Sequence, residues 1–228
     1  MTPKDLKDFN LYARDKGISS LGLHYYNQKI ESSLTPYILE ERSLNVTQMD
    51  VFSRLLRDRI LFISGEVNDN MSVITQAQLL FLDSVDNDDI TMYINTPGGS
   101  VPAGLTMVAT MDFIASDIQT INTGTAASMG SILLGAGTKG KRAGIKFSKV
   151  MLHQISFGGQ GNIQDLRINY DEAEKYNKIL FDLLGDYCNK SSEEILNNTV
   201  RDLWLDTDEA LKYGIIDEIV KKNNKKKK

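Results

Sequence analysis

The chain has 228 residues, 41% of them hydrophobic and 25% charged, which is an ordinary balance for a globular protein. This length is enough for one domain with a substantial core. The net charge of −4 becomes −10 without the six lysines of residues 221–228, so the charge balance does not point to a nucleic-acid partner. No run of residues approaches the ~20 apolar positions that a membrane span needs.

Cysteine usage and the first residues bear on the cellular compartment. Cys188 is the single cysteine, so the chain cannot form an internal disulfide, which fits a reducing compartment. Residues 1–17 lack the continuous apolar stretch of a secretory signal. We therefore expect a cytoplasmic protein. Cys188 lies at the end of a helical pattern and is expected to be a half-buried structural thiol.

One folded domain is expected over residues 34–220. Residues 1–33 are polar and have no sustained period, and we interpret them as a leader, propeptide or disordered extension. Residues 34–48 are expected to form a short apolar strand or arm followed by a polar loop. The lysine-rich residues 221–228 are interpreted as a disordered tail.

From Met49 onward, the apolar spacing predicts strands that alternate with helices. The predicted strands are LFIS, 89–95, IQTINTG, KVMLHQI and the closing IIDEIV. The predicted helices are 51–60, 71–83, 102–116, the segment after Ser128, 163–188, 191–198 and 207–213. Such alternation across short turns is typical of an α/β fold with a largely parallel sheet.

Ser128 lies in the segment GTAASMG, where an apolar strand pattern gives way to an apolar helix pattern. The simplest interpretation of a serine in that position is a helix N-cap. A nucleophile is the alternative, because small flanking residues allow another backbone to approach closely and the helix N-terminus suits a developing oxyanion. A serine hydroxyl acts as a nucleophile only when a base removes its proton.

His153 is the better-placed base, because the second histidine, His24, lies in the irregular leader. A lone histidine inside a strand is usually structural, but beside a candidate nucleophile it fits a general base. A carboxylate should then orient the imidazole. Spacing alone does not choose among the candidates near the ends of predicted elements, which are Asp112, Asp165, Asp202 and Asp206.

The turn NTPGGS, residues 95–100, follows a predicted buried strand. Its simplest interpretation is an ordinary tight turn. The functional interpretation is that the backbone N–H of Gly98 or Gly99 lies against a substrate carbonyl. A phosphate cradle is weakly indicated, because the sequence here matches neither GxGxxG nor GK[ST]. The sequence also lacks metal-ligand spacing and the GxSxG motif of α/β-hydrolases.

Several blocks of the sequence resemble, in order and spacing, the proteolytic subunits of the ATP-dependent Clp protease family (ClpP, peptidase family S14). The blocks are MDVFSRLLRDRILF, YINTPGGSVPAGLTMVATMDFI, INTGTAASMGSILLGAGTKGKR, SKVMLHQ, GGQGNIQD and RDLWLDTDEALKYGIIDEI. The resemblance covers residues 34–220 and is highly specific. It implies the ClpP/crotonase-like fold, a superhelix of ββα units with a protruding handle. The handle would consist of a strand near 155–163 and the helix 163–188.

The resemblance also implies an activity and a set of roles. The activity is that of a serine endopeptidase that hydrolyses unfolded proteins through an acyl-enzyme. Ser128 would be the nucleophile, His153 the general base and Asp202 the third member of the triad. The backbone N–H groups of Gly99 and Met129 would form the oxyanion hole. The peptidase itself would need no metal or cofactor, since ATP is used by a partner.

Partners are implied by the same resemblance. The family assembles as two stacked seven-subunit rings that enclose the active sites. An AAA+ unfoldase, such as ClpX or a ClpA/ClpC relative, feeds unfolded polypeptides into them. The hydrophobic pocket for this partner would involve Tyr93, Phe113 and Val220. Neither nucleic acid nor membrane is implied, and the leader would be removed near residue 33 or 34.

Some positions depart from the family pattern. Thr96 stands where the family usually has serine, and Ile155 stands where it usually has proline. Ile155 restores a backbone N–H that proline lacks. Val200 replaces an acidic residue that would help pair with Arg201 across the ring equator. Thr91 replaces an aromatic residue that is frequent in the partner pocket.

Two other functions compete with an active peptidase. A catalytically silent subunit of a mixed ring would have no reason to keep Ser128, His153 and Asp202 together. A crotonase-fold acyl-CoA enzyme would use backbone N–H groups as an oxyanion hole and would need no serine nucleophile.

Overall fold

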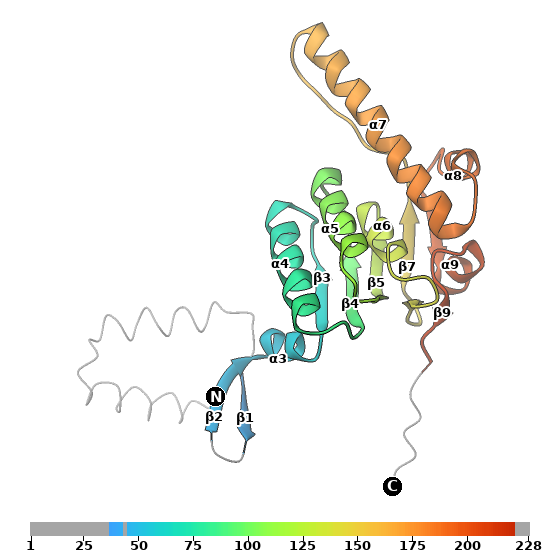
Figure 1. Cartoon of the computed structure of the whole chain (residues 1–228). Helices are drawn as coiled ribbons and strands as arrows, with labels where there is room; N and C mark the ends of the chain where they lie inside the picture. The colour runs from blue at the N-terminus through green and yellow to red at the C-terminus, as the bar shows by residue number, and fades with distance from the viewer. Residues whose placement is uncertain (1–36, 43–44, 222–228) are drawn as a thin grey trace, which may run out of the picture. The chain divides into compact units, whose positions relative to one another are not determined.

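The computed structural model describes residues 37–42 and 45–221, and the chain divides into two compact units, 1–54 and 55–228 (Figure 1). In the first unit, β1 (Tyr37–Arg42) pairs antiparallel with β2 (Asn45–Asp50). The second of these strands was not expected, because polar residues suggested a loop. Pairing with a neighbour decides strand formation more than polarity does. The predicted leader boundary and residues 222–228 of the predicted tail lie outside the described residues, and both calls stay predictions.

The second unit contains a seven-stranded sheet. Its main order is β3 (Ile60–Ser64), β4 (Ile90–Thr96), β5 (Ile118–Ala127), β6 (Arg142–Gly144) and β9 (Glu218–Ile219). Neighbours along this path are parallel. The expected α/β fold with a largely parallel sheet is confirmed.

Strand β5 is long enough to pair with two partners in succession. Residues 120–122 pair with β6, and residues 125–127 pair with β7 (Lys149–Leu152). Strand β8 (Leu203–Asp206) then adds antiparallel to β7, with Leu203 opposite Leu152. This branch brings the ends of three strands that are distant in sequence to one edge, where the candidate site lies.

Helices lie between the strands along the chain. They are α3 (Val51–Arg57), α4 (Asp69–Val85), α5 (Val101–Phe113), α6 (Met129–Gly135), α7 (Ile163–Cys188), α8 (Ser192–Asn198) and α9 (Thr207–Tyr213). Helix α4 packs on α5, α5 on α6, and α6 on β4, β5 and α7. The N-terminal part of α7 projects away from the sheet (Figure 1). Every residue of α6 is buried, as expected for a predominantly apolar helix.

Two expectations about the sheet were wrong, and two of its strands were not predicted. Strand β7 ends at Leu152, so His153 follows the strand instead of lying in it. Residues 155–162 were expected to begin the handle as a strand, but they have no regular structure. No strand of the described residues pairs with them. Glycines at 158, 159 and 161 disfavour an extended ladder there. Strands β6 and β8 were not predicted, because their sequences RAG and LWLD are too short to show a period.

A buried ion pair ties the far end of the sheet to α7. The guanidinium of Arg142, on β6, donates to both carboxylate oxygens of Asp217 and to the carbonyls of Tyr187 and Gly214. Burial alone would raise the pKa of Asp217, but the hydrogen bonds and charge of Arg142 outweigh it and lower that pKa. The pair therefore joins β6, the segment before β9 and the C-terminal end of α7.

Candidate active site

Ser128 occupies a strained turn between β5 and α6. Its φ of 54° and ψ of −124° are rare for a residue with a side chain, and strain of this kind often marks functional sites. The main chain is held on both sides. The Ser128 N–H donates to the carbonyl of Met151, and its own carbonyl accepts from the N–H and the hydroxyl of Ser131. The result is a strand–turn–helix presentation of a serine without the GxSxG sequence.

The side chain of Ser128 does not cap α6, although the residue stands at the N-cap position. Its Oγ lies 2.7 Å from Nε2 of His153. For Nε2 to accept the hydroxyl proton, the ring proton must be on Nδ1. The N-cap interpretation is therefore wrong, and the pairing of this hydroxyl with an imidazole is the arrangement that a serine nucleophile requires.

Geometry separates the four carboxylate candidates that spacing left open. Asp202 Oδ1 lies 3.9 Å from Nδ1 of His153, within ion-pair distance but beyond a hydrogen bond, and its side chain is 63% exposed. Asp206 instead caps α9, Asp165 lies in the first turn of α7, and Asp112 is exposed near the end of α5. Among the described residues, Asp202 is the carboxylate that faces the imidazole.

The turn after β4 packs directly against the serine. A Cβ at Gly98 would lie 2.6 Å from the Ser128 Cβ, and one at Gly99 would lie 2.3 Å from the Val67 carbonyl oxygen. Both glycines also have positive φ, so neither position admits a side chain. The backbone N–H groups of Gly99 and Met129 donate to no acceptor within the described part of the chain. They are the two donors expected for an oxyanion hole, and they remain available to a ligand.

Thr96 holds this turn in place. Its buried hydroxyl donates to the carbonyl of Gly65 and accepts from the N–H of Gly98 at 3.0 Å. A Cβ at Gly130 would lie 2.6 Å from the Thr96 methyl, so that methyl packs on the first turn of α6. Thr96 thus touches both segments that carry the expected oxyanion donors.

A cavity of about 110 Å³ opens beside the serine and the imidazole. Its wall is mostly apolar and includes residues from α5, α6, the segment after His153, and α7. The lining residues are Gly99, Val101, Ser128, Met129, Ser131, Ile132, His153, Ile155, Ser156, Leu180 and Leu184. The contributions of Val101, Ser131, Ile132, Leu180 and Leu184 were not anticipated. Only the spacing of Ser131, three positions after Ser128 at a helix start, offered a signal in the sequence.

Comparison with known proteins identifies the family of this fold and site. The model of the family described as Clp protease matches residues 43–223. The chain belongs to the Clp protease family. It is 47% identical over 217 residues to the ATP-dependent Clp protease proteolytic subunit of Bacteroides fragilis (strain YCH46), covering 94% of this chain and 99% of that protein. Proteins of the same name from Porphyromonas gingivalis (strain ATCC BAA-308 / W83) and Lactococcus lactis subsp. lactis (strain IL1403) are 46% and 47% identical over 222 and 196 residues.

Those two alignments cover 96% and 85% of this chain and 100% and 98% of the relatives. The family resemblance and the peptidase class inferred from the sequence are confirmed by these matches. The roles of individual residues in this Clp protease family member are not addressed by them and stay predictions.

The three residues expected in a partner pocket do not meet within one chain. Tyr93 lies on β4 and stacks on Phe62, with ring centroids 5.3 Å apart. Phe113 ends α5 and is highly exposed, and Val220 follows β9. Strands β5 and β6 separate β4 from β9 in the sheet. A pocket containing Tyr93 and Val220 would therefore need a second copy, and it stays a prediction.

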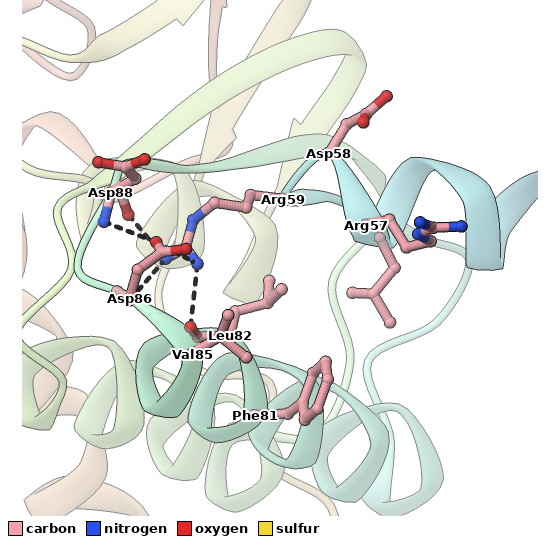
Figure 2. Close-up of a pocket in the computed structure, with 9 residues that line it drawn as sticks. Arg57, Asp58, Arg59, Phe81, Leu82, Val85, Asp86 and Asp88 are labelled. Carbon is pink, nitrogen blue, oxygen red and sulfur yellow. Dashed lines mark hydrogen bonds and ion pairs between the residues drawn. The ribbon is translucent and has the colours of Figure 1, made fainter.

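A larger cavity, of about 430 Å³, lies where β3 begins and α4 ends (Figure 2). Arg59 forms one side of it with a positive φ of 61°. Its guanidinium donates to the carbonyl of Leu82 and pairs with Asp86 at 2.8 Å. Since α4 has no basic residue in its own last turn, Arg59 supplies the positive charge at that helix end.

Other chemistry is not supported in the described part of the chain. Cys188 is buried and unpaired with another cysteine, and burial raises the pKa of its thiol to about 12, so it fits the structural role expected for it. Residues 37–42 and 45–221 hold no group of three or more His, Cys, Asp or Glu side chains placed to bind a metal ion. Within these residues, none of the helices is long and apolar enough to cross a membrane.

Proposed function

We propose that this chain is the proteolytic subunit of an ATP-dependent Clp protease and cleaves peptide bonds with Ser128, His153 and Asp202. The observation that carries the proposal is the 2.7 Å contact between Ser128 Oγ and His153 Nε2 at a strained strand-to-helix turn. The names of the relatives, which are ATP-dependent Clp protease proteolytic subunits, support it.

The proposed reaction begins when Ser128 Oγ attacks the substrate carbonyl carbon and passes its proton to His153 Nε2. The N–H groups of Gly99 and Met129 stabilise the resulting oxyanion. As the C–N bond breaks, His153 returns the proton to the leaving amine, and an acyl-enzyme remains on Ser128. Water then attacks the ester, giving its proton to His153, and the proton returns to Ser128 Oγ as the carboxylic acid leaves.

Asp202 stabilises the imidazolium that forms in both halves of this reaction. Its oxygen must approach Nδ1 by about 1 Å to reach hydrogen-bond distance. The side chain is largely exposed, so rotation toward the imidazole meets little steric resistance. Assembly or substrate binding would draw Asp202 toward the imidazole, because either removes water from the site and strengthens the charge interaction between the two groups.

The cavity beside Ser128 indicates which bonds are cleaved. Val101, Ile132, Ile155, Leu180 and Leu184 give it an apolar wall. An apolar side chain next to the scissile bond would displace water from this wall, whereas a charged one would lose its own hydration without a partner. We therefore propose that peptides with a leucine-sized apolar residue before the scissile bond are the preferred substrates.

Assembly and partners form part of the same proposal. The subunits would stack as two seven-membered rings around the active sites, and an AAA+ unfoldase of the ClpX or ClpA/ClpC type would deliver unfolded polypeptides. ATP would be used by that unfoldase, and this chain would need no metal or cofactor. The partner pocket would combine Tyr93, Phe113 and Val220 from neighbouring subunits, and the single cysteine fits a cytoplasmic location.

Active-site labelling tests the proposal. The assembled protein would be treated with a fluorophosphonate probe and the adduct located by peptide mass spectrometry. We expect labelling at Ser128, no labelling of Ser128→Ala, and a rate at least about 100-fold lower for His153→Ala, since the base must take the hydroxyl proton. Ser84→Ala serves as the matched control, because Ser84 is an exposed hydroxyl on α4.

Two results would contradict the proposal. An assembled ring that carries no adduct at Ser128 would favour the silent-subunit alternative. Labelling that persists in His153→Ala at the unsubstituted rate would remove the imidazole from the mechanism.

A further inference from the structure

We propose that Asn177, on α7, is a positioning residue for His153 and acts through the backbone of Ile155. This inference rests on the proposed peptidase function. The N–H of Ile155 donates to Oδ1 of Asn177 at 3.1 Å. The bond joins residues 22 positions apart, so it ties the segment that follows His153 to the long helix.

The segment after His153 has few other restraints. Strand β7 ends at Leu152, and α7 begins at Ile163. Within residues 154–161, the bond from Ile155 is the only backbone hydrogen bond to another described residue. Three of these positions are glycines, whose backbone is the most mobile when untethered. His153 is therefore held by β7 on one side and, on the other, by the bond from Ile155, two residues beyond it, to Asn177.

The imidazole gains little rigidity from its carboxylate neighbour. Oδ1 of Asp202 lies 3.9 Å from Nδ1 of His153, which is too far for a hydrogen bond, so none is formed there. The ring is instead aimed at Ser128 by the backbone that carries it. A shift of about 1 Å in a group that must move a proton costs up to about 100-fold in rate. A tether on the main chain beside His153 thus has a direct effect on the Ser128–His153 contact.

Asn177 is suited to this role by its chemistry and by its place on α7. A backbone N–H is a donor, so the amide must present its oxygen and not its NH₂ group. Asn177 is half-buried and precedes Leu180 and Leu184 by three and seven positions, which places all three on one face of the helix. Those two leucines line the cavity beside Ser128. One face of α7 therefore shapes the cavity and anchors the segment that carries the base.

The first test compares three substitutions on the same helix in the full-length assembled protein. Asn177→Leu has a similar size and no acceptor, Asn177→Asp keeps an acceptor oxygen, and Asn169→Leu makes the same change at an exposed position. The measurement is kcat and KM with a short fluorogenic peptide. We expect Asn177→Leu to lower kcat by about 10- to 100-fold with KM within about twofold. Asn177→Asp should restore most of kcat, and Asn169→Leu should match the unsubstituted chain.

The second test removes the donor instead of the acceptor. Ile155→Pro has no N–H at this position. If both changes break one bond, the double variant Asn177→Leu/Ile155→Pro should have a kcat within about twofold of the slower single variant. Losses that multiply would overturn the proposal. If Asn177→Leu fails to assemble, the kcat of Ile155→Pro is the deciding measurement. An unchanged kcat in Ile155→Pro would then overturn the proposal.

The controls separate this inference from the function on which it rests. An unsubstituted chain that neither hydrolyses the peptide nor labels at Ser128 would overturn both. An active unsubstituted chain would overturn the inference alone if Asn177→Leu kept its kcat, or if Asn177→Asp lost as much as Asn177→Leu.

Discussion

The hydroxyl of Thr96 offers a sharp way to disturb the expected oxyanion hole without touching the triad. Thr96→Val keeps the shape of the side chain and removes the hydroxyl, whereas Thr96→Ser keeps the hydroxyl and removes the methyl. The hydroxyl bridges the carbonyl of Gly65 and the N–H of Gly98. Gly98 is buried and Gly65 is exposed, so water can replace the lost partner at Gly65 and not at Gly98.

The expected magnitudes follow from these contacts. One buried N–H left without a partner costs about 1–3 kcal/mol of unfolding free energy in Thr96→Val. Losing the methyl that packs on Gly130 costs about 1 kcal/mol in Thr96→Ser. For catalysis, losing an entire oxyanion donor costs about 100- to 1,000-fold in kcat. A turn loosened one residue before Gly99 should cost Thr96→Val about 10- to 100-fold, with Thr96→Ser within about threefold.

The assay pairs urea unfolding at fixed chain concentration with kcat and KM on a short peptide. Fixed concentration matters because assembly adds to the apparent stability. KM should change little in either variant, since the oxyanion donors act mainly on the transition state. Equal kcat values for Thr96→Val and Thr96→Ser would refute the reasoning, because they would show that the hydroxyl does not hold the turn in its working position.

Two further substitutions test the framework around the site. Asp217→Asn should lower the unfolding free energy by about 3 kcal/mol at pH 7 by breaking the buried pair with Arg142. Because the folded pKa of Asp217 is lowered, the stability from this carboxylate is present above about pH 4 and is lost as pH falls through the lowered pKa. A pH series of urea unfolding should therefore be steeper below about pH 4 for the unsubstituted chain than for Asp217→Asn, and parallel curves would contradict this. Arg59→Met should speed amide exchange about tenfold at the C-terminal end of α4, since Leu82 and Asp86 lose their partner. Unchanged amide exchange at the C-terminal end of α4 would mean that the Arg59 guanidinium does not stabilise that helix end.

The candidate site shows how much can be predicted from residue patterns in the sequence. Ser128 stood out because small residues and a strand-to-helix change surround it, and those features follow directly from steric limits on the backbone. The choice between an N-cap and a nucleophile depended on where its Oγ points, and that direction follows from a strained φ and ψ imposed by contacts with Met151 and Ser131. The contact with Met151 joins residues 23 positions apart, so no pattern of nearby residues could reveal it.

The carboxylate illustrates the same limit. Asp202, Asp206 and Asp165 all lie near element ends, so spacing alone does not show which of them orients the imidazole. Pairing of β8 with β7 places Asp202 near His153, while the other two are engaged at helix starts. Strand β8 itself was not predicted, so its consequence for the site was out of reach. Family resemblance selected Asp202 independently, and its role stays a prediction.

The sequence by itself predicted the α/β class with a largely parallel sheet, the family, and Ser128 and His153 as candidate catalytic residues. Apolar periodicity encodes the fold class locally, whereas the family follows from the order and spacing of whole sequence blocks. Tertiary structure decided which groups meet: the imidazole with the serine, Thr96 with Gly65 and Gly98, and Asn177 with Ile155. These contacts join residues 2 to 31 positions apart. The contact of Thr96 with Gly65 needs β3 paired with β4, the contact of His153 with Ser128 needs β7 paired with β5, and the contact of Asn177 with Ile155 needs α7 in place.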